Sequence, residues 1–338
     1  MKAAPRVTVC IPTYDRPRWL GRAIASVLAQ RYGDLRLEIH DDATPGPDVR
    51  DVVAAFDDPR VHLIEHAENA GIVGNFSRSL LGATTEYVLQ LGDDDVMHPD
   101  LVGTTVDALD RHPTAGIAHA RFDLVGEEDE IVLADVDWTV DGGRPPLESG
   151  EDFRRASMLY GCRVCSSTAL LRRSAVPPDG FRQQDFPAFD FVCWLRMAEQ
   201  SDVAFIPRAL CRYRLHQESH SSGVADLRGD AYVQRLQTLE TVHAVKLRHI
   251  QATGGSAELA RLAHKGRARD LLARVRHQTV PGRPFFRTAR ELARGIRIEP
   301  ALARDIEAWL LLAGSVVKSP NVARIKRSSP AIRRRRPG

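Results

Sequence analysis

The chain has 338 residues, of which 43% are hydrophobic and 27% charged, and its formal net charge is +3. This length allows one large domain or two smaller ones, and the composition is that of an ordinary folded protein. The first residues lack the apolar core of a signal peptide, and the longest late apolar run, residues 309–317, is too short to span a bilayer. These features argue against a secreted or membrane-spanning protein and predict a cytoplasmic location.

The charges are unevenly distributed along the chain. Residues 225–338 contain about 24 Lys and Arg against about 9 Asp and Glu, so the preceding two-thirds is net acidic. Such an asymmetry suggests that the two parts have different partners.

The five cysteines are an odd number in a long chain without a secretion signal, so we expect reduced thiols. Cys162 and Cys165 form one CxxC pair, but the sequence has no second pair to complete a zinc set. Buried small residues are the favoured interpretation of this pair, with a zinc or redox site as the alternative.

Strand and helix patterns alternate in the first third of the chain. Short apolar runs predict strands, and apolar stripes at helical spacing predict helices after them. The strands are predicted at 7–11, 35–40, 61–65 and 87–91, and the helices at 17–28, 48–56, 72–82 and from Pro99 to 109. This alternation favours a parallel sheet covered by helices on both faces, in which ligands bind beyond the carboxyl ends of the strands.

The later segments are less regular. We expect antiparallel strands over 115–150 with an acidic loop at 127–130, a helix at 191–200 and a short strand at 203–206. From residue 226 onward the pattern is helical and basic, with breaks at 254–255, 281–282 and 320, and residues 324–336 have a composition typical of disorder.

Two acidic clusters follow predicted strands. Asp93, Asp94 and Asp95 come directly after the fourth strand, where a divalent cation would relieve their repulsion and bridge to substrate phosphates. The alternative is a solvated acidic turn that caps the next helix. Asp41 and Asp42 end the second strand, where a carboxylate can accept from a base N–H or a ribose hydroxyl. Their alternative is an Asx-turn that leads into a helix.

These clusters belong to a longer series of motifs, which occur in one order over roughly residues 6–222. The motifs are IPTYDRP at 11–17, SVLAQ at 26–30, DD at 41–42, NAG at 69–71, EYVLQLGDDDVMHPD at 86–100, Asp190 with WLR at 194–196, and YRLH at 213–216. In this order they resemble the family-2 inverting glycosyltransferases of the GT-A fold, a Rossmann-like, mostly parallel sheet flanked by helices. The resemblance implies a catalytic domain over 1–222, and the composition predicts a basic helical region over 223–320 and a disordered basic tail over 321–338.

The resemblance also implies roles for individual residues. It places the nucleotide against Pro12, Thr13, Tyr14 and Arg16 and the Asn69 loop, and it implies that Asp42 reads the base. Asp94 matches the metal ligand of the family's Asp-x-Asp element, Asp93 would hold the ribose, and Asp95 would help at the metal. The first Asp of that element is replaced by Gly92.

The catalytic base is implied at Asp190, where the family has a Glu-Asp pair and this chain has Phe189-Asp190. Asp185 is the second choice of base. The alternative for Asp190 is an N-cap of the following helix. His216 resembles a histidine near the diphosphate or the metal, and its alternative is a surface histidine at a strand end.

The implied reaction is a single displacement with inversion, assisted by Mg²⁺ or Mn²⁺, from a nucleoside-diphosphate sugar to a glycan, lipid-linked or small-molecule acceptor. The positive charge of the C-terminal part favours peripheral contact with the inner face of an anionic membrane. An inactive GT-A-like binding protein and a sugar nucleotidyltransferase are the alternatives. Nucleic-acid binding is not expected, because this part has few aromatic residues and no known motif.

Overall fold

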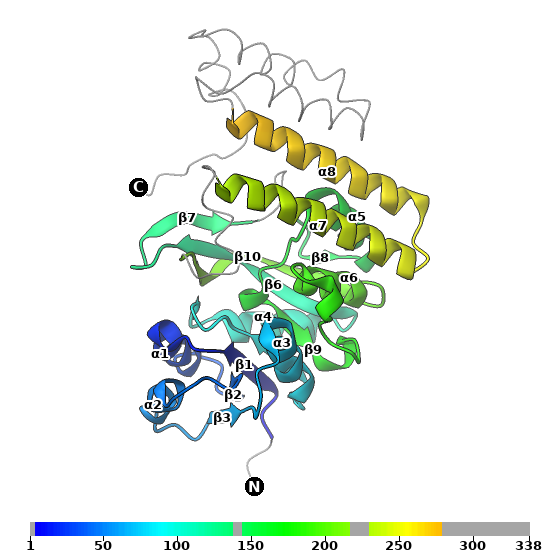
Figure 1. The fold of residues 1–338 in the computed structure, drawn as a ribbon. Coiled ribbons are helices and arrows are strands. Elements are labelled where there is room, and N and C mark those ends of the chain that lie inside the picture. Colours follow the sequence, from blue (N-terminus) through cyan, green and yellow to red (C-terminus); the bar gives the residue numbers. More distant parts are fainter. Residues whose placement is uncertain (1–3, 138–143, 217–229, 279–338) are drawn as a thin grey trace, which may run out of the picture. The chain divides into compact units, whose positions relative to one another are not determined.

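The computed structural model describes residues 4–137, 144–216 and 230–278 (Figure 1). The chain divides into two compact units, one of Met1–Ser157 with Cys162–Val245 and the other of Met158–Gly161 with Lys246–Gly338. The first unit contains the whole sheet. The predicted boundary after residue 222, the breaks at 281–282 and 320, the apolar run at 309–317 and the basic tail lie outside the described residues.

Four parallel strands form one half of the sheet, as the sequence predicts. They are β1 (Val7–Thr13), β2 (Leu35–Asp41), β3 (Val61–Glu65) and β4 (Tyr87–Gln90), in the spatial order β3-β2-β1-β4. The helices between them are α1 (Pro17–Leu28), α2 (Asp48–Ala54) and α3 (Gly71–Gly82). The helix predicted from Pro99, α4 (Leu101–Arg111), begins two residues later than expected, after Asp100 as its N-cap.

The other half of the sheet is mixed. The short strand β9 (Leu170–Arg172) lies antiparallel between β4 and β6 (Ala115–Val125), and β10 (Asp202–Arg214) runs parallel to β6 with β5 (Val96–Met97) outside it. The expected antiparallel pairing after residue 115 is confirmed by β6 and β7 (Ile131–Val136), which flank the acidic loop. The strand β8 (Leu147–Glu148) pairs with β10.

Two elements differ from their predicted extent. The strand expected at 203–206 continues to Arg214, with a register shift after Ile206 where Pro207 cannot donate to the ladder. The helix expected at 191–200 is α6 (Phe189–Met197). Sequence patterns did not predict α5 (Gly150–Tyr160), which has a polar composition. The break at 254–255 is confirmed, since α7 (Asp230–Ala252) ends before it and α8 (Ala257–Gln278) begins after it.

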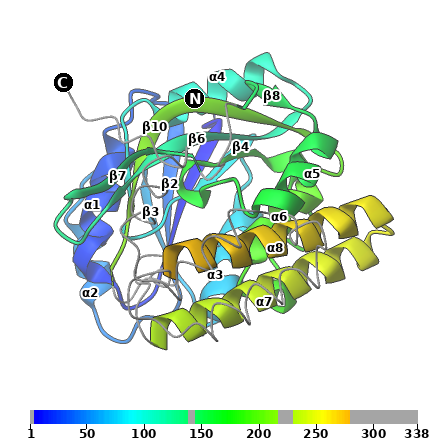
Figure 2. The ribbon, with the colours of Figure 1, turned by 90° about the horizontal axis from the view of Figure 1, so that it is seen from above.

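Each face of the sheet packs against its own helices (Figure 2). One apolar core joins α1, α2 and α4 to inward side chains such as Val9, Ile11 and Leu37. The other joins α3, α5 and α6 to the opposite face, where Cys10 and Val88 lie. Because strands alternate their side chains between faces, both faces of β1 are buried.

All five cysteines are free, and only Cys162 is not buried, in agreement with the predicted reduced thiols. Among the described residues, no helix has the length and apolar character needed to cross a membrane.

Candidate active site

The loop after β4 lies at the carboxyl end of the parallel strands and positions its three carboxylates differently. Asp93 is buried, and its Oδ2 accepts a hydrogen bond from the Thr13 hydroxyl at 2.8 Å. The Arg16 guanidinium lies 3.6 Å from Asp93 and 3.7 Å from Asp94. The structure therefore brings Thr13, Arg16, Asp93 and Asp94 together at the ends of β1 and β4.

His216 joins this cluster from the segment after β10. Its Nε2 lies 2.8 Å from Oδ2 of Asp94, and its buried ring packs on Trp19 with the centroids 4.3 Å apart. Within the described part of the chain, its Nδ1 has no hydrogen-bond partner. A carboxylate and an imidazole that converge in this way could hold a divalent transition-metal ion such as Mn²⁺, with phosphate oxygens and water as its other ligands.

Asp95 has a different environment. Only 2% of its surface is exposed, and its oxygens accept from the Ser167 hydroxyl and from the Arg214 amide N–H, the latter at 2.9 Å. Both oxygens are thus already hydrogen-bonded within the protein, so Asp95 fixes the loop on β10.

Gly92, which stands in place of the family's first Asp, leaves no room for a side chain. A Cβ at this position would lie 2.9 Å from Oδ1 of Asp94 and 2.9 Å from Oδ2 of Asp95. A side chain at this position would therefore require the carboxylates of Asp94 and Asp95 to shift.

The electrostatics of the loop favour a cation. Burial, followed by the charge of Asp94, raises the pKa of Asp93 to about 7, although Arg16 and Thr13 oppose the shift. Burial and Asp94 also raise the pKa of Asp95 well above its ordinary value. A divalent ion at Asp94 would offset this repulsion between neighbouring carboxylates.

Arg214 is fully buried and joins the loop after β4, which contains Asp93 to Asp95, to the acidic loop at 127–130 between β6 and β7. Its Nε donates to the Asp94 carbonyl at 2.9 Å, and its Nη1 donates to the carbonyls of Gly126 and Glu127 at 2.9 and 3.1 Å. Its Nη2 pairs with Asp129 at 2.5 Å. This arginine is part of the YRLH motif, and nothing local to the sequence indicates its partners.

The residues predicted to read the nucleoside lie along the end of β2. The carboxylate of Asp42 is 1% exposed and accepts from the Ala70 amide N–H at 2.9 and 3.1 Å. Asn69 is exposed, and its side chain accepts from the Gly71 amide N–H at 2.8 Å. Asp42 is joined to the first cluster through its own N–H, which donates to the Thr13 carbonyl at 3.0 Å.

The remaining predicted residues of this region differ in exposure. Tyr14 is 44% exposed, whereas Pro12 is buried inside β1. The Oδ1 of Asp41 accepts from the Thr44 amide N–H at 3.2 Å, which lies three residues on rather than the two of an Asx-turn.

Asp190 lies in the first turn of α6 and is half-buried. Its Oδ2 accepts from the Ser166 hydroxyl at 3.1 Å and its Oδ1 from the Phe191 amide N–H at 2.6 Å. Burial raises the pKa of Asp190, and the two hydrogen bonds lower it by less. The N-cap alternative is wrong, because the N-cap is Ala188.

Asp185, the second choice of base, is buried and pairs with Arg182 at 2.7 Å. Ser166 and Ser167 are neighbours in a short 3-10 helix (Ser166–Thr168), and they contact Asp190 and Asp95 respectively. Sequence reasoning missed both serines, which have no distinctive motif.

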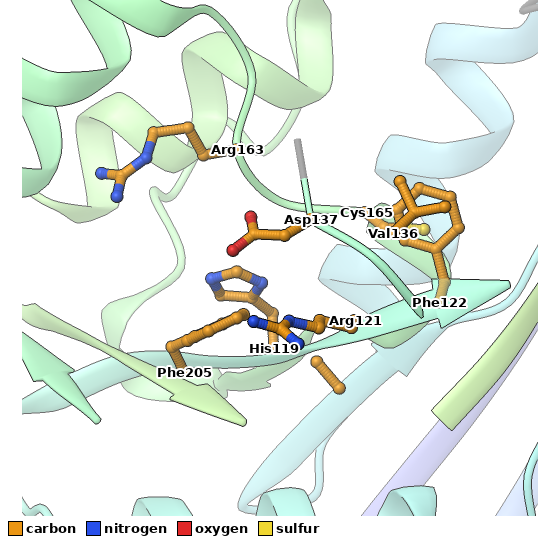
Figure 3. Close-up of a pocket in the computed structure, with 9 residues that line it drawn as sticks. His119, Arg121, Phe122, Val136, Asp137, Arg163, Cys165 and Phe205 are labelled. Carbon is orange, nitrogen blue, oxygen red and sulfur yellow. The ribbon is translucent and has the colours of Figure 1, made fainter. Parts of the chain in front are cut away.

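A small pocket lies beside this 3-10 helix (Figure 3). Its cavity volume is about 10 Å³, and its wall includes Cys165, which directly precedes Ser166. Figure 3 shows the His119 ring and the Asp137 carboxylate turned into it. Arg144 lies 3.0 Å from both groups. This cavity volume is about the space that one water molecule needs, so the pocket is not a substrate site by itself.

Comparison with known proteins identifies the family and the relatives that this chain resembles. The family model for glycosyl transferase family 2 matches residues 8–176. The uncharacterized protein y4gI of Sinorhizobium fredii is 28% identical over 205 residues, which cover 59% of this chain and only 21% of that protein.

Two solved structures share the fold. The mannosyltransferase PcManGT of Pyrobaculum calidifontis, in complex with GDP-Man and Mn²⁺, has a TM-score of 0.54 at 17% identity and covers 94% of this chain and 87% of its own. Residues 1–349 of TarS from S. aureus, in complex with UDP-GlcNAc, have a TM-score of 0.53 at 12% identity, with 91% of each chain covered. The predicted GT-A fold is confirmed, and the chain belongs to glycosyl transferase family 2.

Proposed function

We propose that the chain transfers a sugar from a nucleoside-diphosphate sugar to an acceptor hydroxyl, with inversion at the anomeric carbon. The observation that supports this most is the 2.8 Å approach of His216 to Asp94, since it joins two segments far apart in the sequence beside Arg16 and Asp93. The solved neighbours with UDP-GlcNAc and with GDP-Man indicate the class of donor.

In this proposal Asp94 and His216 would hold Mg²⁺ or Mn²⁺, and the ion would supply positive charge for the diphosphate leaving group. Arg16 lies within 4 Å of the same carboxylate and adds positive charge at this end of the site. Thr13 and Asp93 lie on the ribose side of the donor, and Asp42 and the loop that contains Asn69 flank the base. Asp95 fixes the loop rather than binding the metal, because its oxygens are already hydrogen-bonded.

Asp190 is the proposed general base, which accepts the proton of the attacking hydroxyl. Its carboxylate has a raised pKa, which makes it a stronger base than an exposed aspartate. One displacement by an acceptor on the face opposite the diphosphate inverts the anomeric carbon, so no covalent intermediate is required. The acceptor is a glycan, a lipid-linked glycan or a small molecule, and peripheral contact with an anionic membrane belongs to the same proposal.

The test is thermal stabilisation by nucleoside diphosphates. Melting temperatures are measured with UDP, GDP and dTDP, in Mn²⁺ and in chelator, for the native chain, Asp94→Ala and the matched surface control Asp107→Ala on α4. A ligand present at 100 times its Kd stabilises the fold by about 2.7 kcal/mol. We expect one diphosphate to stabilise the native chain and the control only with Mn²⁺, and Asp94→Ala not to respond.

A native chain that melts at the same temperature with every diphosphate, with or without Mn²⁺, would favour the inactive binding protein instead. Activity is then measured with the matching sugar nucleotides, and the anomeric configuration of the product by NMR tests inversion.

A further inference from the structure

The face of the sheet beneath α3 contains a second group of metal-binding side chains, separate from the carboxylate loop. One donor atom each from Cys10, Glu38 and His40 lies within 4.8 Å of the other two, and all three residues are buried. Strands of a doubly covered parallel sheet are normally apolar on both faces. Three metal-binding side chains at this depth therefore need an explanation.

The sheet register makes the cluster. Cys10 of β1 pairs with Glu38 of β2, so their side chains are neighbours on one face. His40 lies two residues after Glu38 and shares that face because side chains alternate along a strand. Cys10 belongs to the apolar cluster that includes Val73 and Leu80 of α3. Without an ion, its thiol donates to the Ser79 carbonyl at 3.4 Å.

Glu38 and His40 each contact a further side chain outside the cluster. The Oε2 of Glu38 lies 3.2 Å from Nε2 of His40, while its Oε1 pairs with Arg36 at 2.9 Å. The Nδ1 of His40 lies 3.4 Å from Nε2 of His66. Partners on the far atoms of ligating histidines and carboxylates are a regular feature of protein metal sites.

We propose that Cys10, Glu38 and His40 bind a Zn²⁺ ion that joins β1 to β2. A thiolate, a carboxylate and an imidazole form a zinc donor set, whereas a thiolate is a poor ligand for Mg²⁺ or Mn²⁺. The thiolate and carboxylate balance the charge of the ion. Zinc bonds of about 2.0–2.3 Å require the donors to draw together to about 3.5 Å, and the fourth position is left to water.

The position of this site gives it a structural role beneath the proposed donor site. Cys10 precedes Pro12 by two residues, and His40 precedes Asp42 by two. The side-chain amide of Asn75 in α3 already joins the two strand ends, since it donates to the Thr13 carbonyl at 3.2 Å and to the His40 carbonyl at 3.0 Å. The zinc would join the same two strands, β1 and β2, further from their carboxyl ends than Asn75 does. The proposal does not depend on the reaction.

The test uses Co²⁺ as a spectroscopic probe on the full chain after chelation. We expect one equivalent of Co²⁺ to give a thiolate-to-cobalt charge-transfer band that Zn²⁺ abolishes by displacement. The band should persist in Asp94→Ala, which lacks the proposed catalytic ligand, and in Cys162→Ser, which disrupts the CxxC pair. It should be lost in Cys10→Ser.

His66→Ala provides a second variant whose substitution leaves the three donors in place. It should keep the band and lower the Zn²⁺ affinity by about 10- to 100-fold. Circular dichroism establishes that each variant is folded, and Glu38→Gln replaces Cys10→Ser if the latter is not. Absence of the band in the native chain, or a band lost in Cys162→Ser but kept in Cys10→Ser, would overturn the proposal. The cluster would then be an Arg36–Glu38–His40 ion network beside a protonated thiol.

Discussion

Asp190 combines two conditions that a general base needs, a raised pKa and a fixed orientation. Its raised pKa comes from burial, and the hydrogen bonds from Ser166 and from the Phe191 N–H limit the shift. Because the ionised form is disfavoured in the fold, this carboxyl costs stability as the pH rises from its ordinary pKa through its raised one. Loss of stability at a functional residue is typical of active sites.

Replacement of the base should separate activity from stability. In Asp190→Asn we expect kcat to fall by about 10²- to 10⁴-fold, since proton transfer to a positioned base contributes about this much. The amide removes a disfavoured charge, so the melting temperature relative to the native chain should rise with pH. Kinetics and thermal melts at pH 5 and pH 8 measure both. A variant with native kcat would show that Asp190 is not the base.

Ser166 should set the pH dependence of the reaction. Its hydrogen bond lowers the pKa of Asp190, so Ser166→Ala should raise that pKa and move the acid limb of kcat/KM to higher pH. Ser166→Thr keeps the hydroxyl and should restore the native profile. An acid limb that does not move in Ser166→Ala, with only the plateau lowered, would indicate that the serine acts through packing alone.

At the scale of elements, the site depends on two loops that β10 holds in place. Asp95 anchors the β4 loop to the Arg214 amide, while the Arg214 side chain joins the Asp94 carbonyl to the β6–β7 loop. The exposed arginines of α1 contact the same acidic loop, for example Arg18 with Glu127 at 3.1 Å. The buried arginine therefore connects two loops that are distant in the sequence, the one after β4 and the one between β6 and β7.

Gly92 should tolerate no side chain. In Gly92→Ala the new Cβ would approach Asp94 and Asp95 to 2.9 Å, which displaces both carboxylates. We expect at least a tenfold loss of Mn²⁺-dependent nucleotide affinity, with a stability loss of about 1–3 kcal/mol. Gly103→Ala on α4 is the matched control, since its Cβ meets only Tyr32 at 3.7 Å. Calorimetric titration with native affinity in Gly92→Ala would contradict this.

Arg214 should contribute far more to stability than the exposed Arg18. Arg214→Met removes four hydrogen-bond donations from a fully buried guanidinium, and breaking such a buried pair costs about 3–5 kcal/mol. Arg18→Ala breaks surface pairs and should cost less than about 1 kcal/mol. Urea unfolding measures both, and equal losses would refute the role given to Arg214.

At the scale of the whole molecule, the acidic catalytic portion and the basic C-terminal portion differ in charge by composition alone. The excess of about 15 positive charges over residues 225–338 predicts binding to vesicles that contain anionic lipid, with attraction screened by salt. We expect co-sedimentation with anionic vesicles at low ionic strength, loss at high ionic strength, and none with neutral vesicles. Failure to bind anionic vesicles at low salt would remove the membrane from the proposal.

Much of the fold follows from local patterns in the sequence. The alternation of apolar runs and helical stripes predicted β1 to β4 and α1 to α4 to within a few residues, because each pattern reports which face of one element is buried. The polar helix α5 and the short β9 were missed for the same reason, since neither has a long apolar period of its own.

The sequence by itself therefore determined the strand–helix order, the family and the types of residue at the ends of the strands. Only the tertiary structure decided their partners: Asp94 with His216, Asp95 with Ser167, Asp42 with the Ala70 amide, and Cys10 with Glu38 and His40. The physical reason is that hydrophobic periodicity is a local property of the chain. Contacts between residues that are distant in sequence depend instead on strand order and register, which are fixed when the whole core packs.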